Sequence, residues 1–340
     1  MSMKRLCVFF ILALLVSVPQ FLLGQNRKTG INSAAFLKVG VGARQVGLGS
    51  ATTSLEGDAA NMFWNPAGIG LKSYTLQASV NYNMWIADLT QNALAVTYNL
   101  EGIGTVGLGV MTFGVSDIPT DRDIYPGNPS LQALQIDDQT SSTYDYMDLL
   151  VQLSYARQVT EQLSLGATVK LINESIDSRS ASSVAFDFGS VYSIGVMDWK
   201  IGARINNLGG DIKFYDYAAA IPLTFSIGTS ISPLKDENSL LTVSVDAVKP
   251  QDGLQYFYSG AEYTFMNMIS VRGGYKLNYS GVDDGGSSFR SAIKTSIEGL
   301  SAGAGFMTTL ADYHLRIDYS FTQMDLLDPA HRVSLSFSMK

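Results

Sequence analysis

The stretch DYHLRIDYSFT, Asp312–Thr322, has a clear two-residue period. Every second residue from Tyr313 to Phe321 is apolar or aromatic, and the residues between them are polar. Successive side chains of a β-strand point to opposite faces, so this pattern predicts a strand with one apolar and one polar face. The same alternation recurs at Leu163–Leu171, Leu241–Ala247 and Val333–Met339. The chain is therefore expected to be all-β.

Strand length separates a soluble sheet protein from a membrane barrel. Strands in soluble proteins average ~5 to 6 residues, whereas a strand that crosses a bilayer obliquely needs ~9 to 11. The predicted strands run approximately over residues 74–84, 89–100, 104–115, 146–158, 162–176, 183–195, 197–207, 222–232, 239–249, 255–265, 268–279, 299–309, 312–322 and 331–340. They are long enough for a transmembrane antiparallel β-barrel of about 14 strands over residues 73–340.

The predicted connections between these strands alternate in length. The even-numbered connections are short, and the long ones, 116–145, 208–221 and 280–298, are all odd-numbered. Outer-membrane barrels have short periplasmic turns and longer external loops. A soluble exported β-protein, the alternative, has no reason to sort its connections in this way. The apolar faces are then expected to contact outer-membrane lipid.

The N-terminus and the overall composition indicate export. Residues 1–24 are expected to be a signal peptide, because Lys4 and Arg5 precede the apolar run Leu6–Val18. An uncleaved N-terminal membrane anchor is the alternative. Cys7, the single cysteine, lies inside that run, so the mature chain has no thiol. A net charge of −7 gives no electrostatic reason to bind nucleic acid.

Motifs for catalysis and metal binding are missing from the sequence. The two histidines, His314 and His331, accompany no HExxH motif, no serine elbow and no cysteine nucleophile. The acidic clusters Asp121–Asp123 and Asp283–Gly286 lack the spacing of a calcium loop. We therefore expect a protein that is not an enzyme and uses no metal or cofactor.

The longest predicted connection carries apolar residues among its turn residues: Tyr125, Leu131, Leu134 and Ile136. Long loops with apolar side chains often cover a pore mouth or contact a partner. Simple packing of the loop on itself is the alternative.

The segment Gly40–Leu71, GVGARQVGLGSATTSLEGDAANMFWNPAGIGL, differs from the strands that follow it. Its G-x-G start does not continue as G-x-G-x-x-G, which excludes the dinucleotide-binding motif. Asp58 is suited to cap a short helix over Ala59–Phe63, and Asn65-Pro66 is suited to end it. Arg44 would pair with carboxylates in the lumen. Residues 25–72 are therefore predicted to form a plug, with a disordered tail before the barrel as the alternative.

This segment resembles the opening of the PorV/PorQ family of outer-membrane proteins from the Bacteroidota, within the wider FadL-like barrel superfamily. The matching residues after Phe36-Leu37 are Gly42, Ala43, Arg44, Gly47, Gly49, Ala51, Asp58, Ala59, Trp64, Asn65, Pro66, Ala67 and Gly68. The resemblance implies a fourteen-stranded barrel in the cell outer membrane, with an N-terminal segment in its lumen or periplasmic mouth.

The resemblance implies two alternative functions. PorV-like members serve type IX secretion, binding the C-terminal signal domains of cargo and passing cargo to surface attachment components. FadL-like members transport hydrophobic small molecules through the barrel. The first hypothesis is protein export with type IX secretion components or cargo as partners, and the alternative is transport of a hydrophobic ligand.

Overall fold

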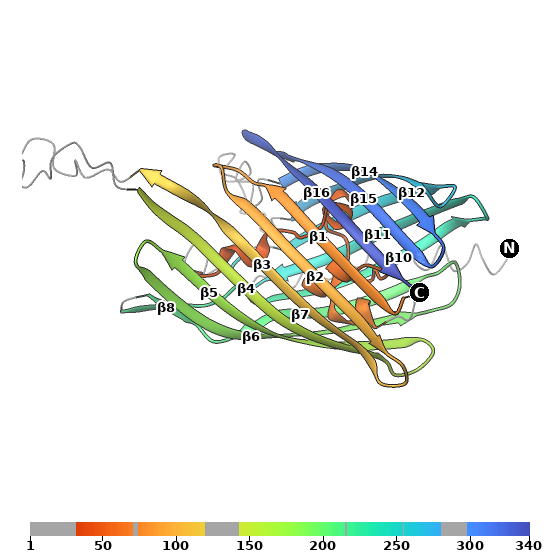
Figure 1. The fold of residues 1–340 in the computed structure, drawn as a ribbon, viewed down its shortest axis with the longest axis horizontal. Helices are drawn as coiled ribbons and strands as arrows, with labels where there is room; N and C mark the ends of the chain where they lie inside the picture. The colour runs from red at the N-terminus through yellow and green to blue at the C-terminus, as the bar shows by residue number, and fades with distance from the viewer. Residues whose placement is uncertain (1–31, 71–73, 120–142, 215, 254, 280–297) are drawn as a thin grey trace, which may run out of the picture.

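The computed structural model describes residues 32–70, 74–119, 143–214, 216–253, 255–279 and 298–340. Within these residues, 14 antiparallel strands close into a barrel, as the sequence predicts (Figure 1). The barrel strands are β1 (Leu76–Met84), β2 (Thr90–Leu100), β3 (Gly104–Pro119), β4 (Thr143–Gln158), β5 (Leu163–Ile176), β6 (Arg179–Ser193), β7 (Lys200–Gly209), β10 (Thr224–Lys235), β11 (Ser239–Pro250), β12 (Gln255–Phe265), β13 (Ile269–Tyr279), β14 (Glu298–Leu310), β15 (Tyr313–Met324) and β16 (Leu327–Met339). Strands that are adjacent in sequence are paired, and β1 pairs with β16 to close the barrel.

Several predicted boundaries are wrong at the ends of strands. β3 extends to Pro119 and β4 begins at Thr143, so both strands continue into the predicted loop 116–145. β16 begins at Leu327 instead of residue 331, because its pairing with β15 continues across Pro329. The predicted loop 208–221 contains the hairpin β8 (Ile212–Phe214) and β9 (Tyr217–Ala219). These segments lack a clean two-residue period, so the pattern could not reveal them.

The wall of the barrel is polar inside and apolar outside. On β1 the side chains of Gln77, Ser79 and Asn81 are buried, whereas Val80 and Tyr82 are exposed. This arrangement reverses that of a soluble core, and it is the arrangement of a barrel whose outer face contacts lipid.

The two ends of the barrel differ. At one end, called here the short-turn end, the even-numbered connections are two to six residues long, as between Leu100 and Gly104. The opposite end, called here the long-loop end, holds the β8–β9 hairpin and the projecting tips of β3 and β4 (Figure 1). Lys340 lies at the short-turn end, where Thr75 bonds to Met339.

Residues 32–70, called here the interior segment, lie inside the barrel (Figure 1, red and orange). The segment contains η1 (Ala35–Lys38), α2 (Ala43–Gly47), η2 (Ala59–Phe63) and η3 (Pro66–Ile69), where η denotes a 3₁₀-helix. None of the helices in the described residues is long and apolar enough to cross a membrane.

Candidate functional site

The interior segment is bound to the barrel wall along its length. Near the long-loop end, the Ser33 amide donates to Ala220, and the Ala34 amide donates to Glu174 Oε1 at 2.6 Å. Ala43, at the start of α2, donates its amide to Ser334 Oγ at 2.7 Å. These contacts join residues that are far apart in sequence, and they fix the segment in the lumen.

Glycines allow the segment to approach the wall closely. Gly49 has a φ of 61°, and a Cβ on it would lie 2.6 Å from the amide nitrogen of Tyr275. Gly274 on β13 faces it, and a Cβ there would lie 2.0 Å from the Gly49 nitrogen. Gly42 also has a positive φ, of 93°, before α2. Gly47, by contrast, is an ordinary helical residue with space around it, since its nearest neighbour would be 3.4 Å from a Cβ.

Two polar residues cap the short helices near the short-turn end. The Asp58 carboxylate accepts from the Ala60 amide at 2.9 Å and so caps η2. Asn65 caps η3 by accepting from the Ala67 amide, and its own amide donates to Thr53 at 2.6 Å. Pro66 occupies the first turn of η3. The Asn65-Pro66 pair therefore follows one helix and begins another, which the sequence did not predict.

Trp64 and Gly68 are the remaining motif residues of this region. Trp64 is 9% exposed, its indole donates to Val41 at 2.8 Å, and the Arg204 guanidinium lies 5.3 Å from its ring centroid. A Cβ on Gly68 would lie 2.7 Å from the carbonyl oxygen of Leu55. The indole and the glycine pack the interior segment against itself.

A chain of ion pairs crosses the lumen and joins the segment to β12, β13 and β15. Arg44 makes a bidentate contact with Glu262, at 2.8 and 3.0 Å. Arg272 joins Glu262 to Asp318, and its Nη1 lies 2.7 Å from Asp318. Arg316 joins Asp318, at 2.7 Å, to Asp58. Three arginines thus alternate with three carboxylates, and the network carries no net charge. Because all six groups are largely buried, each needs its partners.

The electrostatic environment of the two segment residues matches this geometry. Burial alone would raise the pKa of Asp58, but Arg316 and the Ala60 amide outweigh it and hold that pKa below its usual value. Burial alone would lower the pKa of Arg44, but the paired Glu262 raises it above its usual value. Both groups therefore stay charged at neutral pH.

An apolar cluster occupies the long-loop half of the lumen, where an aqueous pore would have polar walls. It combines Phe36 and Val41 of the interior segment with inward-facing residues of β3, β4 and β5. Those wall residues are Met111, Phe113, Leu150 and Ile172, and each is at most 5% exposed. Two residues of the β8–β9 hairpin add to this cluster: Ile212 is part of it, and Phe214 packs against it. Apolar side chains therefore line the lumen along β3, β4 and β5.

A small cavity lies between this part of the segment and the wall. Its lining is Leu37, Lys38, Val39, Gly40, Val41, Phe63, Trp64, Met111, Leu150 and Lys170. The volume is about 40 Å³, well below the ~150 Å³ of a protein cavity that binds benzene. Phe63 also packs against a second apolar cluster nearer the short-turn end, with Met62 and Ile69. An apolar path thus continues along the same side of the barrel.

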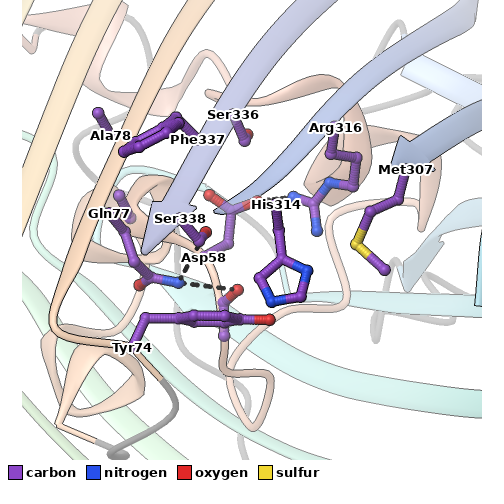
Figure 2. Close-up of a pocket in the computed structure, with 12 residues that line it drawn as sticks. Asp58, Tyr74, Gln77, Ala78, Met307, His314, Arg316, Ser336, Phe337 and Ser338 are labelled. Atoms are coloured by element: carbon purple, nitrogen blue, oxygen red, sulfur yellow. Dashed lines mark hydrogen bonds and ion pairs between the residues drawn. The ribbon is translucent and has the colours of Figure 1, made fainter. Parts of the chain in front are cut away.

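A second hollow lies at the short-turn end, beside the Arg316–Asp58 pair (Figure 2). The Tyr74 ring meets the His314 ring edge to face, with centroids 5.2 Å apart. Gln77 donates to Gly57, beside them. This hollow, of about 30 Å³, is mixed in polarity, and residues of β1, β14, β15 and β16 line it together with residues 57–59.

The structure brings the motif residues Gly42, Ala43, Arg44, Asp58, Trp64 and Asn65 into contact with the wall or with one another. The predicted lid or partner loop, with Tyr125, Leu131, Leu134 and Ile136, lies outside the described residues. Sequence reasoning missed the apolar wall. Its signal was an apolar residue in the polar phase of a strand, such as Leu150 between Asp148 and Gln152.

Comparisons with known proteins agree on the fold. Comparison with protein-family models gives no match, and neither does comparison with curated proteins. Among solved structures, the Pseudomonas putida toluene transporter TodX is 14% identical, with a TM-score of 0.57 over 88% of this chain and 97% of its own. The CymD monoaromatic hydrocarbon channel gives 14% and 0.57 over 89% and 98%. A Pseudomonas aeruginosa FadL homologue gives 12% and 0.51 over 88% and 98%.

The chain has the barrel fold of these three structures. At these identities the likeness covers the fold, so the chemistry must come from the residues of this chain. The lumen offers an ion-pair network without net charge and, nearer the long-loop end, an apolar cluster beside a small cavity that residues 37–41 help to line. No catalytic arrangement is required to bind a small apolar molecule there.

Proposed function

We propose that this protein is a non-enzymatic outer-membrane channel for small hydrophobic molecules. The apolar cluster inside the lumen, which borders the small cavity, carries the proposal. A channel for hydrophilic solutes gains nothing from burying Met111, Phe113 and Leu150 toward its lumen. A channel for apolar molecules gains an environment that such molecules prefer to water. The fold shared with hydrocarbon channels supports the same function.

The conformation described here is closed. A cavity of about 40 Å³ leaves no room for an aromatic ring. Residues Leu37–Val41 form one side of the cavity, and few polar contacts bind them to the wall. Those contacts are the Lys38–Asp252 pair and a bond from Gln91 to the Val39 carbonyl. In this proposal, entry of the ligand displaces these residues while the ion pairs hold α2 and η2 in place.

Uptake of a radiolabelled monoaromatic hydrocarbon at low concentration tests the proposal. Cells that express the protein should take up more than cells that carry an empty vector. The change Leu150→Trp fills the cavity and should reduce uptake to the background. Its matched control is Leu149→Trp, because Leu149 is the adjacent residue and faces outward. Heat-modifiable migration on gels verifies that each variant folds. Equal uptake by the L150W and L149W variants would contradict the proposal.

Protein export by type IX secretion is the second candidate, and it rests on the resemblance of the segment Phe36–Gly68 to PorV/PorQ proteins. The structural neighbours favour the transporter over this first hypothesis, since they are channels. A tagged pull-down from outer membranes should recover cargo or attachment proteins under the export hypothesis. Recovery of the barrel without any protein partner would contradict it.

A further inference from the structure

Beside the small cavity next to the apolar cluster lies a buried polar group without a partner. Gln152 on β4 is 1% exposed, and neither its amide nitrogen nor its amide oxygen has a hydrogen-bond partner. Almost all buried amide groups in proteins are hydrogen-bonded, because water is lost on burial and must be replaced. An amide that is unpartnered in the closed state is therefore available to a molecule that enters.

The register of the strands places Gln152 next to three residues that line the cavity, Leu150, Lys170 and Phe63. It follows the lining residue Leu150 by two positions, on the same inward face of β4. It lies directly opposite Lys170, another lining residue, in the pairing of β4 with β5. On the other side it lies over Gly109 of β3, whose missing side chain leaves space for it. A Cβ on Gly109 would be 3.0 Å from Gln152 Nε2 and 3.2 Å from the Phe63 ring.

The charges around the cavity exclude a strong preference for an ion. Lys170 lies 2.6 Å from Asp187, and both are almost completely buried. Lys38, the other cation of the lining, lies 2.6 Å from Asp252. Each cation is thus neutralised by a carboxylate. A ligand with a full charge would have to break one of these pairs.

We propose that the channel selects small, neutral, mainly apolar molecules that carry one hydrogen-bonding group, such as phenols, over bare hydrocarbons. Gln152 is the residue that determines this specificity. Its amide oxygen accepts from the ligand hydroxyl and its amide nitrogen donates to the hydroxyl oxygen, while the ring contacts Leu150, Met111 and Phe63. This inference rests on the proposed function and names its substrate class.

Equilibrium dialysis with purified protein in nanodiscs tests the inference, with empty discs as the blank. The ligands are toluene, p-cresol and p-toluate, which share one ring and differ in the polar group. Wild-type protein should bind p-cresol roughly fivefold more tightly than toluene, as one added hydrogen bond allows, and p-toluate least. Gln152→Met keeps the side-chain size and removes the amide, so the ratio of the p-cresol affinity to the toluene affinity should fall to about one.

The matched control is Gln77→Met, the same change at a lumenal glutamine on β1 near the short-turn end. This variant should keep the wild-type preference. Equal binding of toluene and p-cresol by wild-type protein, or an unchanged preference in Q152M, would overturn the inference and leave the proposed function standing. Tightest binding of p-toluate would overturn the choice of a neutral ligand. Binding of none of the three above empty discs would overturn the proposed function as well.

Discussion

At the scale of single residues, close approach and charge pairing explain most of the motif in the interior segment. Gly49 and Gly42 have backbone angles that side chains disfavour, and Gly49 also touches β13. Arg44 forms an ion pair with Glu262, and Asp58 forms one with Arg316. These roles are structural, and they hold the segment in the closed barrel.

Gly47 and Gly49 should respond differently to substitution by alanine. Gly49→Ala introduces a Cβ 2.6 Å from a backbone nitrogen at a positive φ, so it should destabilise the protein by about 2 kcal/mol. Gly47→Ala adds a methyl group where there is room, within α2, and should change the free energy of unfolding by less than about 0.5 kcal/mol. Urea unfolding in detergent measures both variants. Equal effects would show that the contact with β13 is not formed.

The buried ion pair of Arg44 should matter far more than an exposed one. Arg44→Ala leaves Glu262 with one partner in the lumen and should cost about 3 kcal/mol. The control is Lys235→Ala, which removes a pair with Asp198 whose side chains are 62% and 43% exposed. That change should cost less than about 1 kcal/mol. The same unfolding assay compares them, and a similar cost for both would contradict the network.

At the scale of elements, the short helices are positioned by their caps and by pairs of glycines. The sequence was sufficient to predict η2, because Asp58, the small residues and Asn65-Pro66 are local signals. It was insufficient for α2, which is five residues long and has no side-chain cap. Asn65-Pro66 was interpreted as the end of η2, although a cap followed by proline is also the signal that begins η3. The ion-pair partners of Arg44 and Asp58 could not be predicted from the sequence either. Glu262 and Arg316 lie more than two hundred residues away, and only the strand register brings them near.

Asp58 should give η2 a dependence on pH. Its pKa in the folded protein lies below the unfolded value of about 3.9. Its contribution to stability is therefore complete above about pH 4 and is lost as the pH falls through the folded pKa. Asp58→Asn keeps an oxygen that can cap η2 but removes the charge that pairs with Arg316. The variant should be less stable than wild type by about 2 kcal/mol at pH 7.

The difference between D58N and wild type should shrink below about pH 4, because the carboxylate takes up a proton first in the unfolded chain and, at lower pH, in the folded protein. Thermal unfolding at pH 7, 5, 4 and 3 follows it. A difference that stays constant to pH 3 would show that Asp58 is not paired as a charged group.

At the scale of the whole molecule, the strand pattern predicted the closed barrel, because a two-residue period and a strand length are properties of one segment at a time. The lumen could not be predicted in the same way. Whether Leu150 and Met111 line a cavity depends on which wall residues the interior segment covers. In the sequence, Leu150 is only an apolar residue at a position of β4 where the alternation predicts a polar one. A residue that simply packs against the interior segment would give the same pattern.

The interior segment should determine whether the barrel conducts ions. Deletion of residues 33–70 removes every described helix and leaves the 14 strands of the described barrel, whose inner wall is largely polar. Water and ions should then fill the lumen. In planar bilayers the deletion variant should show ion-conducting steps, and the protein that keeps residues 33–70 should show almost none. A folded, heat-modifiable deletion variant that stays silent would contradict the placement of the segment.

The central claim is that the cavity between the interior segment and β3–β5 takes up small hydrophobic molecules. Crystals of the protein soaked with p-bromotoluene test it most directly, because bromine is located by its anomalous scattering. The account predicts a bromine peak among Met111, Leu150 and Phe63, with Leu37–Val41 displaced from their closed position. Bromine found only on the outer, lipid-facing wall, with residues 37–41 unmoved, would contradict it.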